Sequence, residues 1–298
     1  MTRLRLSSTA ALLGVLAVAV FHRPATALTG ADAIDSANAY PNVGLIMVWR
    51  DANNPLGLPG GLAAAVTGVL IQSQTILTAG HCTDFWSTLA AEGDLDSIMV
   101  SFDSQASVDD DWMPDGGTWY EASEWLTHEN YVEAEWPFTY DYGLLYLDDP
   151  IAGIEPADLP APNALQPIID AMGQTDQRFE DVGYGVQGTI VGGGPPRSAV
   201  TWTRKVAVQR YAPGNGGPSA LADPLWFIVN NSPSPRHGGA CGGDSGSPVL
   251  FADTDTVVAV HTGGYRLGRN GVICGRMTSL NHRIDLPEIL LWIEANLR

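Results

Sequence analysis

The sequence predicts an all-β fold of antiparallel strands, arranged as a sandwich or a barrel, with one helix at the C-terminus. Short apolar runs recur between clusters of turn-forming residues, which is typical of antiparallel strands. No alternation of strands with long helical segments, which a parallel sheet would need, is visible. The expected strands cover residues 43–49, 66–71, 98–102, 143–147, 201–208, 226–229, 248–251 and 257–260.

The helix is expected in the last fourteen or so residues, the only part of the chain with a helical pattern. Asp285 is a suitable capping residue and Pro287 suits a first helical turn. Ile289, Trp292 and Ile293 then recur at helical spacing. This segment therefore predicts an amphipathic helix that packs against the body of the protein.

The first 27 residues have the pattern of a secretory signal. Arg3 and Arg5 precede an apolar run over residues 10–21, and small residues lead up to Ala27. The run is shorter than the roughly 20 residues that a membrane-spanning helix needs. We expect cleavage after Ala27, which leaves residues 28–298 as a secreted, extracellular protein without a membrane anchor.

The mature chain is strongly acidic. The signal contains three arginines and no acidic residue, so its removal moves the formal net charge from −18 to −21. Such a surface argues against nucleic acid as a partner, because the cationic side chains that neutralise phosphates are missing. The acidity is expected to keep the protein soluble, and residues 109–111, three aspartates, predict a solvated loop rather than a calcium site. No metal or other cofactor is expected.

The stretch from Gly242 to Pro248, Gly-Gly-Asp-Ser-Gly-Ser-Pro, contains a candidate nucleophile at Ser245. A serine hydroxyl attacks at neutral pH only with a base in hydrogen-bond reach and with backbone donors aimed at the developing oxyanion. The flanking glycines allow the tight turn that such donors require. By itself this stretch could equally be an ordinary turn.

Two upstream motifs supply the other groups. Thr-Ala-Gly-His-Cys places His81 directly after two short apolar runs, and Asp-Tyr-Gly-Leu-Leu places Asp141 directly before another. The order histidine, aspartate, serine is one of the known chain orders of a catalytic triad. The three motifs together indicate nucleophilic acyl-transfer chemistry.

At these motifs the chain resembles the trypsin/chymotrypsin-like serine proteases. The resemblance implies two six-stranded antiparallel β-barrels with a C-terminal α-helix, forming one protease domain over residues 28–298 with the catalytic cleft between the barrels. It implies Ser245 as nucleophile, His81 as general base and Asp141 as the carboxylate that orients it. The backbone N–H groups of Gly243 and Ser245 match the oxyanion hole of that family.

The resemblance also gives Asp244 a partner. In that family this aspartate pairs with an α-amino group made by proteolysis, and the pairing shapes the oxyanion hole. Residues 28–30, Leu-Thr-Gly, are similar to the mature start of such proteases, and no basic activation site precedes them. We therefore expect signal cleavage itself to free the Leu28 amino group for Asp244. The alternative is a start elsewhere, with Asp244 satisfied by side chains.

Three cysteines are an odd number for an exported protein. By resemblance to the family, Cys241 and Cys274 are expected to form the disulfide bond that braces the primary specificity pocket. The usual partner of Cys82 is replaced by Val66, so Cys82 is expected to be a buried free thiol beside His81.

Substrate preference is less sharply predicted. The family offset from Ser245 places Gly239 at the base of the pocket, where members specific for lysine or arginine carry an aspartate. His261 and Gly263 lie in a His-Thr-Gly-Gly stretch that resembles the pocket strand of the glutamyl endopeptidases. A preference for glutamate and a preference for small or medium apolar residues both remain open.

Two other function classes are weighed against a peptidase. A catalytically silent binding protein of this fold would be expected to have lost a triad residue, and all three are present. An esterase of the α/β-hydrolase class needs glycine two places after the nucleophile, where Ser247 stands, and has its histidine last in the chain. The sequence therefore predicts a secreted serine endopeptidase, monomeric, without cofactor, acting on protein or peptide substrates.

Overall fold

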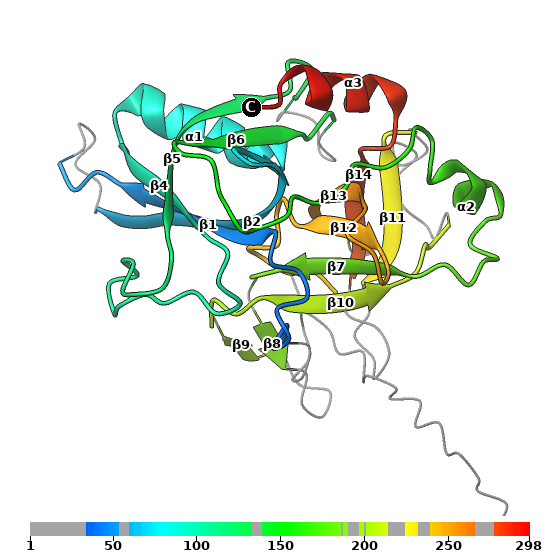
Figure 1. The fold of residues 1–298 in the computed structure, drawn as a ribbon, viewed down its shortest axis with the longest axis horizontal. Coiled ribbons are helices and arrows are strands. Elements are labelled where there is room, and N and C mark those ends of the chain that lie inside the picture. The colour runs from blue at the N-terminus through cyan, green and yellow to red at the C-terminus, as the bar shows by residue number, and fades with distance from the viewer. Residues whose placement is uncertain are drawn as a thin grey trace, which may run out of the picture.

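The computed structural model describes residues 34–53, 60–132, 139–185, 187–189, 197–199, 201–213, 224–231, 239–265 and 277–298. Two six-stranded antiparallel units lie side by side, with little helix (Figure 1). The expected all-β fold with a C-terminal helix is confirmed. No helix in the described part of the chain is both long and apolar enough to cross a membrane. The expected signal, residues 1–27, lies outside the described residues.

The N-terminal unit is a closed barrel in the order β1-β2-β3-β6-β5-β4. The strands are β1 (Val43–Arg50), β2 (Gly61–Gln72), β3 (Thr75–Thr78), β4 (Leu95–Ser101), β5 (Tyr120–Thr127) and β6 (Gly143–Leu147). Closure leaves no free sheet edge. Inward-facing branched and aromatic side chains of these strands fill the barrel, and β1 and β6 are buried almost throughout.

The C-terminal unit is a six-stranded sheet in the order β10-β7-β12-β13-β14-β11. The strands are β7 (Phe179–Gly183), β10 (Lys205–Gln209), β11 (Trp226–Asn231), β12 (Pro248–Phe251), β13 (Val257–Tyr265) and β14 (Met277–Arg283). Just beyond β10, a bridge between Tyr211 and Val229 of β11 brings the two outer strands together. A small separate ribbon consists of β8 (Gln187–Thr189) and β9 (Arg197–Ala199).

The expectation that only the C-terminus is helical is wrong. Helix α1 (Gly80–Glu92) follows β3 directly, and a short helix, α2 (Gln166–Asp170), lies in the connection from β6 to β7. Cys82, Trp86 and Leu89 point inward at helical spacing, so burial of this face stabilises α1 against the N-terminal barrel. Gly93 ends the helix in the left-handed conformation, with φ of 69°.

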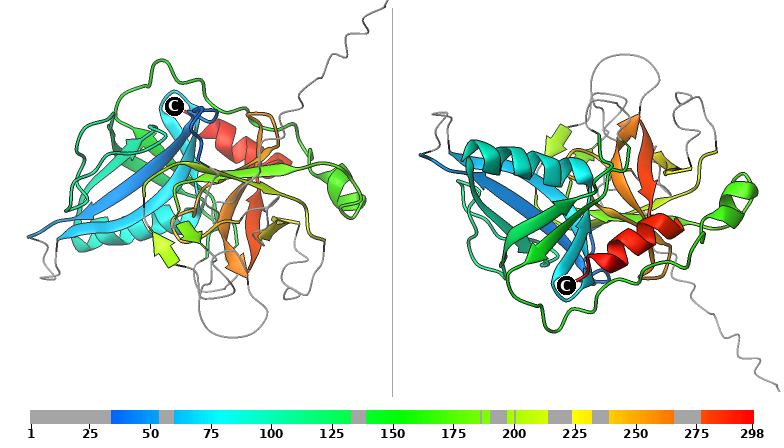
Figure 2. Two further views of the ribbon diagram at one scale, coloured as in Figure 1. Left: turned by 90° about the horizontal axis from the view of Figure 1, so that it is seen from below. Right: turned by 90° about the horizontal axis from the view of Figure 1, so that it is seen from above.

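Helix α3 (Pro287–Ala295) is the predicted C-terminal helix, with proline in its first turn. Its capping residue is Leu286, without a side-chain cap, so the expected role of Asp285 is wrong. The Asp285 carboxylate instead accepts hydrogen bonds from Arg283 and from the Leu165 N–H. The helix starts at the end of β14 and lies across both units (Figure 2). Beyond it, Tyr146 of β6 donates to the Asn296 carbonyl at 3.0 Å.

The aspartate triplet at residues 109–111 lies in the loop between β4 and β5. Asp109 Oδ1 accepts the backbone N–H groups of Asp111 and Met113, each at 2.9 Å. The first acid of the triplet therefore organises its own loop.

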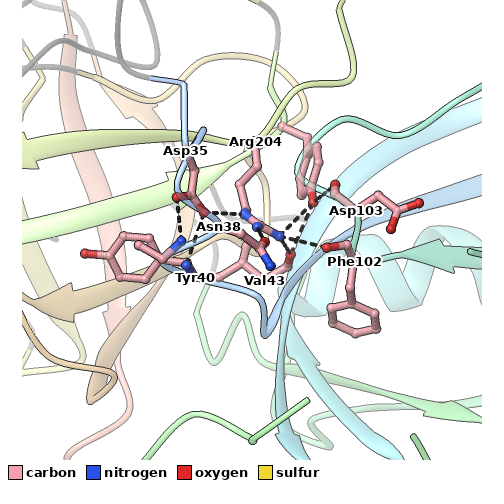
Figure 3. A network of polar contacts seen from close by, with 9 residues as sticks. Asp35, Asn38, Tyr40, Val43, Phe102, Asp103 and Arg204 are labelled. Carbon is pink, nitrogen blue, oxygen red and sulfur yellow. Dashed lines mark hydrogen bonds and ion pairs between the residues drawn. The ribbon is translucent and has the colours of Figure 1, made fainter. Parts of the chain in front are cut away.

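Arg204 connects the two units through a network of polar contacts (Figure 3). This buried guanidinium donates to Asp35 Oδ2 at 2.9 Å and to the carbonyls of Val43 and Phe102, each at 3.0 Å. It also donates to the Asn38 side chain and, at 3.2 Å, to the Tyr184 hydroxyl. Val43 begins β1 and Phe102 directly follows β4, whereas Arg204 precedes β10 of the other unit. The network therefore holds the segment from Asp35 to Val43 between the two units.

Replacing Arg204 by methionine is expected to lower the free energy of unfolding by about 3–5 kcal/mol, because it leaves the Asp35 carboxylate buried without a counter-charge. Urea unfolding would measure this. Arg298→Met removes an exposed ion pair with Glu124 and should cost less than about 1 kcal/mol. Equal losses in the two variants would contradict the role given to Arg204.

Candidate active site

His81 follows the end of β3 and Asp141 precedes the start of β6, so the two residues meet at the same end of this antiparallel pair of strands. β3 ends at Thr78, so His81 lies in the first turn of α1, and Asp141 lies two residues before β6, the strand that pairs with β3. The His81 ring Nδ1 lies 2.9 Å from Asp141 Oδ2 and 3.2 Å from Oδ1. The His81 backbone N–H donates to Asp141 Oδ1 at 2.6 Å. The carboxylate is completely buried, so it fixes both the backbone and the ring of the histidine.

Asp141 remains ionised despite its burial. Burial raises the pKa of this carboxyl, but the charges and hydrogen bonds of His81 and the nearby His282 outweigh that effect and lower its pKa below the ordinary value. His282 Nδ1 lies 2.7 Å from the hydroxyl of Thr262 on β13. His282 of the C-terminal unit therefore adds to the electrostatic environment that stabilises this carboxylate.

The environment of His81 favours its protonated form. Burial lowers the pKa of the imidazole, whereas electrostatic interactions and hydrogen bonds with Cys82 and Asp141 raise it, and the net pKa lies well above 6.5. The side chain is about one-quarter exposed, so protons from solvent can reach it. Cys82 is a buried free thiol, as expected.

Replacing Cys82 by alanine is expected to lower the pKa of His81, because it removes one of the neighbours that stabilise the imidazolium. An NMR titration of the His81 ring would show the midpoint moving to lower pH. Ser87→Ala, one turn further along α1, should leave that midpoint unchanged. An unshifted midpoint in Cys82→Ala would show that Cys82 does not contribute to the raised pKa of His81.

The loop from Gly243 to Ser247 is anchored on the barrel through Thr67 of β2. The Thr67 N–H donates to the Ser245 carbonyl and its hydroxyl donates to the Gly243 carbonyl, each at 3.0 Å. Gly246 has φ of 82°, and a Cβ built there would lie 2.0 Å from Thr78 Oγ1. Only glycine fits this close approach. The contact places the serine loop against the segment that leads into His81.

Two backbone donors of this loop have no acceptor. Among the described residues, nothing accepts the N–H of Gly243 or of Ser245, whereas Asp244, Gly246 and Ser247 all donate within the protein. Gly243 has φ of 92°, a conformation that glycine adopts without strain. Two such N–H groups on a tight turn can donate together to an oxyanion.

Asp244 points away from the serine into the protein. Its two carboxylate oxygens accept the N–H groups of Gly185 at 2.7 Å and Cys241 at 2.8 Å. Burial raises the pKa of this carboxyl to about 7, although both hydrogen bonds and the charge of Lys205 lower it. A buried carboxylate of this kind would be stabilised by a cation placed beside it.

Comparison with protein families decides the family of the chain. The family model of trypsin matches residues 59–284. The chain belongs to the trypsin family. The solved structure titled HL collagenase at 1.7 Å resolution is similar to it, with a TM-score of 0.59 and 15% sequence identity, covering 92% of this chain and 96% of the other. At that identity the likeness shows the fold alone. No curated protein matches the sequence.

Within this trypsin-family fold, the sequence-predicted residues fall into two groups. His81 and Asp141 are in contact, and the loop of Ser245 packs against the segment before His81. Leu28 and Cys274 lie outside the described residues, so the Leu28–Asp244 pair and the Cys241–Cys274 bridge stay predictions.

The specificity residues Gly239, His261 and Gly263 are described. Gly239 is buried, Gly263 is partly exposed and His261 is 3% exposed. His261 Nδ1 lies 2.9 Å from Ser279 Oγ and 3.1 Å from Asn281 Oδ1, and burial lowers the pKa of the ring to about 4. The histidine is therefore uncharged at neutral pH.

Sequence reasoning missed several residues of this trypsin-family site. Thr67, which holds the serine loop, lies inside an apolar strand and looks like any β-branched strand residue. Asp181 of β7 is completely buried and accepts a hydrogen bond from Ser247 at 2.6 Å. No strand was expected at residues 179–183, so the sequence carried no signal that this aspartate is buried.

Proposed function

We propose that this trypsin-family protein is a secreted serine endopeptidase that cleaves peptide bonds through an acyl-enzyme intermediate. The observation that carries the proposal is the buried carboxylate of Asp141, 2.9 Å from His81 Nδ1, together with a serine loop in which two backbone donors have no acceptor among the described residues. Membership of the trypsin family supports the same class of reaction. The chemistry needs no cofactor.

Each residue of the proposed triad has a defined role. In the neutral form of His81, Asp141 holds the single ring proton on Nδ1, so the other ring nitrogen can take the proton of the Ser245 hydroxyl. The serine oxygen then attacks the carbonyl carbon of the scissile bond, and the N–H groups of Gly243 and Ser245 receive the negative charge on the carbonyl oxygen. His81 returns the proton to the leaving amine, and water repeats the sequence to release the acid product.

Cleavage of a peptide library tests the proposal. The library is randomised at the residue before the scissile bond and is incubated with the purified secreted protein, with Ser245→Ala as the blank. Cuts that vanish in the variant establish the peptidase. Hydrolysis of a small ester alone does not, because serine peptidases and esterases share it. A folded protein that binds peptides without cutting them would favour the alternative of a silent binding protein.

The contacts of His261 favour a preference for uncharged residues before the scissile bond. Asn281 donates through its amide nitrogen to the Phe227 carbonyl at 3.0 Å, so its Oδ1 faces His261 as an acceptor. Nδ1 of the neutral ring therefore carries the proton, and the nitrogen on the other side of the ring is an acceptor that repels a carboxylate. The library should show small or medium apolar residues at neutral pH. Strong enrichment of glutamate would instead assign His261 to binding a carboxylate as an imidazolium.

A further inference from the structure

β7 carries a buried acid that the proposed reaction does not use. Asp181 lies on the inward face of β7, opposite Ala207 of β10 and Val249 of β12. It is completely buried, and no cationic side chain of the described residues forms an ion pair with it. An ionised carboxylate between two apolar neighbours would be strongly disfavoured.

Ser247 connects this acid to the serine loop. The Ser247 hydroxyl, two residues beyond Ser245, donates to Asp181 Oδ1 at 2.6 Å. The backbone N–H of Ser247 donates to the Asp244 carbonyl at 2.8 Å, and its carbonyl accepts from His261 at 2.9 Å. Ser247 is completely buried, and Asp181 is the acceptor of its hydroxyl. The position of the loop after the nucleophile therefore depends on this hydrogen bond.

A second buried carboxyl lies close to Asp181 on the same face of β7. A Cβ built on Gly183 would lie 2.3 Å from Asp244 Oδ1, and Gly183 is two residues from Asp181, on the same side of the strand. Lys205, opposite Gly183 on β10, is the charged group whose field acts on Asp244. Two carboxylates this close in a buried site repel each other, so at neutral pH the pair favours a state in which one of them keeps its proton.

Gln209 offers an acceptor for that proton. Its amide nitrogen lies 3.5 Å from Asp181 Oδ2, a long contact, while its Oε1 is buried with no partner in the described part of the chain. Turning the amide so that Oε1 faces Asp181 lets a protonated Oδ2 donate to it. The protonated Oδ2 would then have an acceptor in Gln209 Oε1, and Oδ1 would still accept from Ser247.

We propose that Asp181 is a positioning residue of the serine loop, held as a neutral carboxylic acid between Ser247 and Gln209 beside the carboxylate of Asp244. The inference rests on the proposed peptidase function for its effect on catalysis. Burial, followed by the charge of Asp244, raises the pKa of Asp181 well above 3.8. When Asp181 loses its proton at alkaline pH, repulsion between the two carboxylates displaces the loop that carries the oxyanion donors.

The raised pKa of Asp181 makes the free energy of unfolding fall as pH rises. The unfolded chain releases the Asp181 proton near its ordinary pKa of 3.8, whereas the folded chain keeps it to higher pH. The stabilisation from the neutral acid is therefore complete below pH 3.8 and is lost as pH rises through the folded-state pKa. Asp181→Asn cannot ionise and keeps a similar shape, so its stability should fall less between pH 6 and pH 9.

The test compares Asp181→Asn, Asp181→Ala and Ser247→Ala with the wild type. Asparagine keeps an acceptor for Ser247, so kcat should stay close to wild type at neutral pH and should decline less steeply than wild type at alkaline pH. Alanine leaves Ser247 without its acceptor, and kcat should fall by about 10²-fold with little change in KM, as expected for a misplaced reacting group. Asp94→Asn, a buried acid of the barrel, controls for loss of stability alone and should leave the pH profile of kcat unchanged.

Thermal unfolding from pH 6 to pH 9, measured in a Ser245→Ala background, separates this inference from the proposed function. A flatter pH dependence in Asp181→Asn supports a neutral Asp181 even if the protein cuts no peptide. Where Asp181→Ala does not fold, Ser247→Ala supplies the same loss of the hydrogen bond. An unchanged kcat in Ser247→Ala, or an unchanged pH dependence of unfolding in Asp181→Asn, overturns the proposal.

Discussion

Replacing Asp141 by asparagine is expected to lower kcat for peptide cleavage by about 10⁴-fold with the fold intact. The asparagine amide would present an N–H where the carboxylate now accepts from His81 Nδ1 at 2.9 Å, so the ring would carry its proton on the other nitrogen. In that tautomer His81 cannot accept the proton of Ser245. The variant would also lose the negative charge that stabilises the imidazolium formed during attack.

Steady-state kinetics on the best library substrate would measure this loss, with KM expected to change little. Circular dichroism and thermal unfolding would show whether the fold is kept. Asp285→Asn is a matched control, because Asp285 is equally buried but bonds to Arg283 and Leu165 instead of a histidine. If Asp141→Asn kept wild-type kcat, His81 would not be the general base.

The sequence predicted the fold well where a strand is continuously apolar. The expected strand at residues 143–147 coincides with β6, and those at 248–251 and 257–260 lie in β12 and β13. β5 was missed because its exposed face carries glutamates and its apolar run is interrupted. The expected strand at residues 201–208 begins too early, because β10 starts only at Lys205, after Arg204 has bound Asp35 between the two units.

Helix α1 shows why local patterns were not sufficient. Its inward residues Cys82, Trp86 and Leu89 lie at helical spacing, but the run starts inside the histidine motif and carries no capping side chain. The site was predictable in its chemistry, because histidine, aspartate and serine occur in motifs. Its supporting contacts were not, because Thr67, Asp181 and Arg204 reach their partners only when strands distant in sequence come together.

Blocking the release of a new amino terminus at Leu28 is expected to lower kcat/KM by about 10² to 10³-fold, the typical effect of losing one oxyanion-hole donor. Asp244 is completely buried and accepts only the N–H groups of Gly185 and Cys241 among its described hydrogen bonds. With burial raising its pKa to about 7, the carboxyl is incompletely ionised without a nearby cation. An α-ammonium group at Leu28 would lower that pKa and fix the carboxylate beside Gly243.

Two proteins test this prediction, one that starts at Leu28 and one with several extra residues before it. Mass spectrometry of the purified wild-type protein establishes where the natural chain begins. Only the protein that starts at Leu28 should have full activity, and its kcat/KM should decrease at alkaline pH as the α-amino group loses its proton. Asp244→Asn should lower the activity of that protein to the level of the extended one, since an amide offers no charge to the ammonium. Equal activity of the two proteins would show instead that groups within the described chain, Lys205 among them, are sufficient to stabilise Asp244.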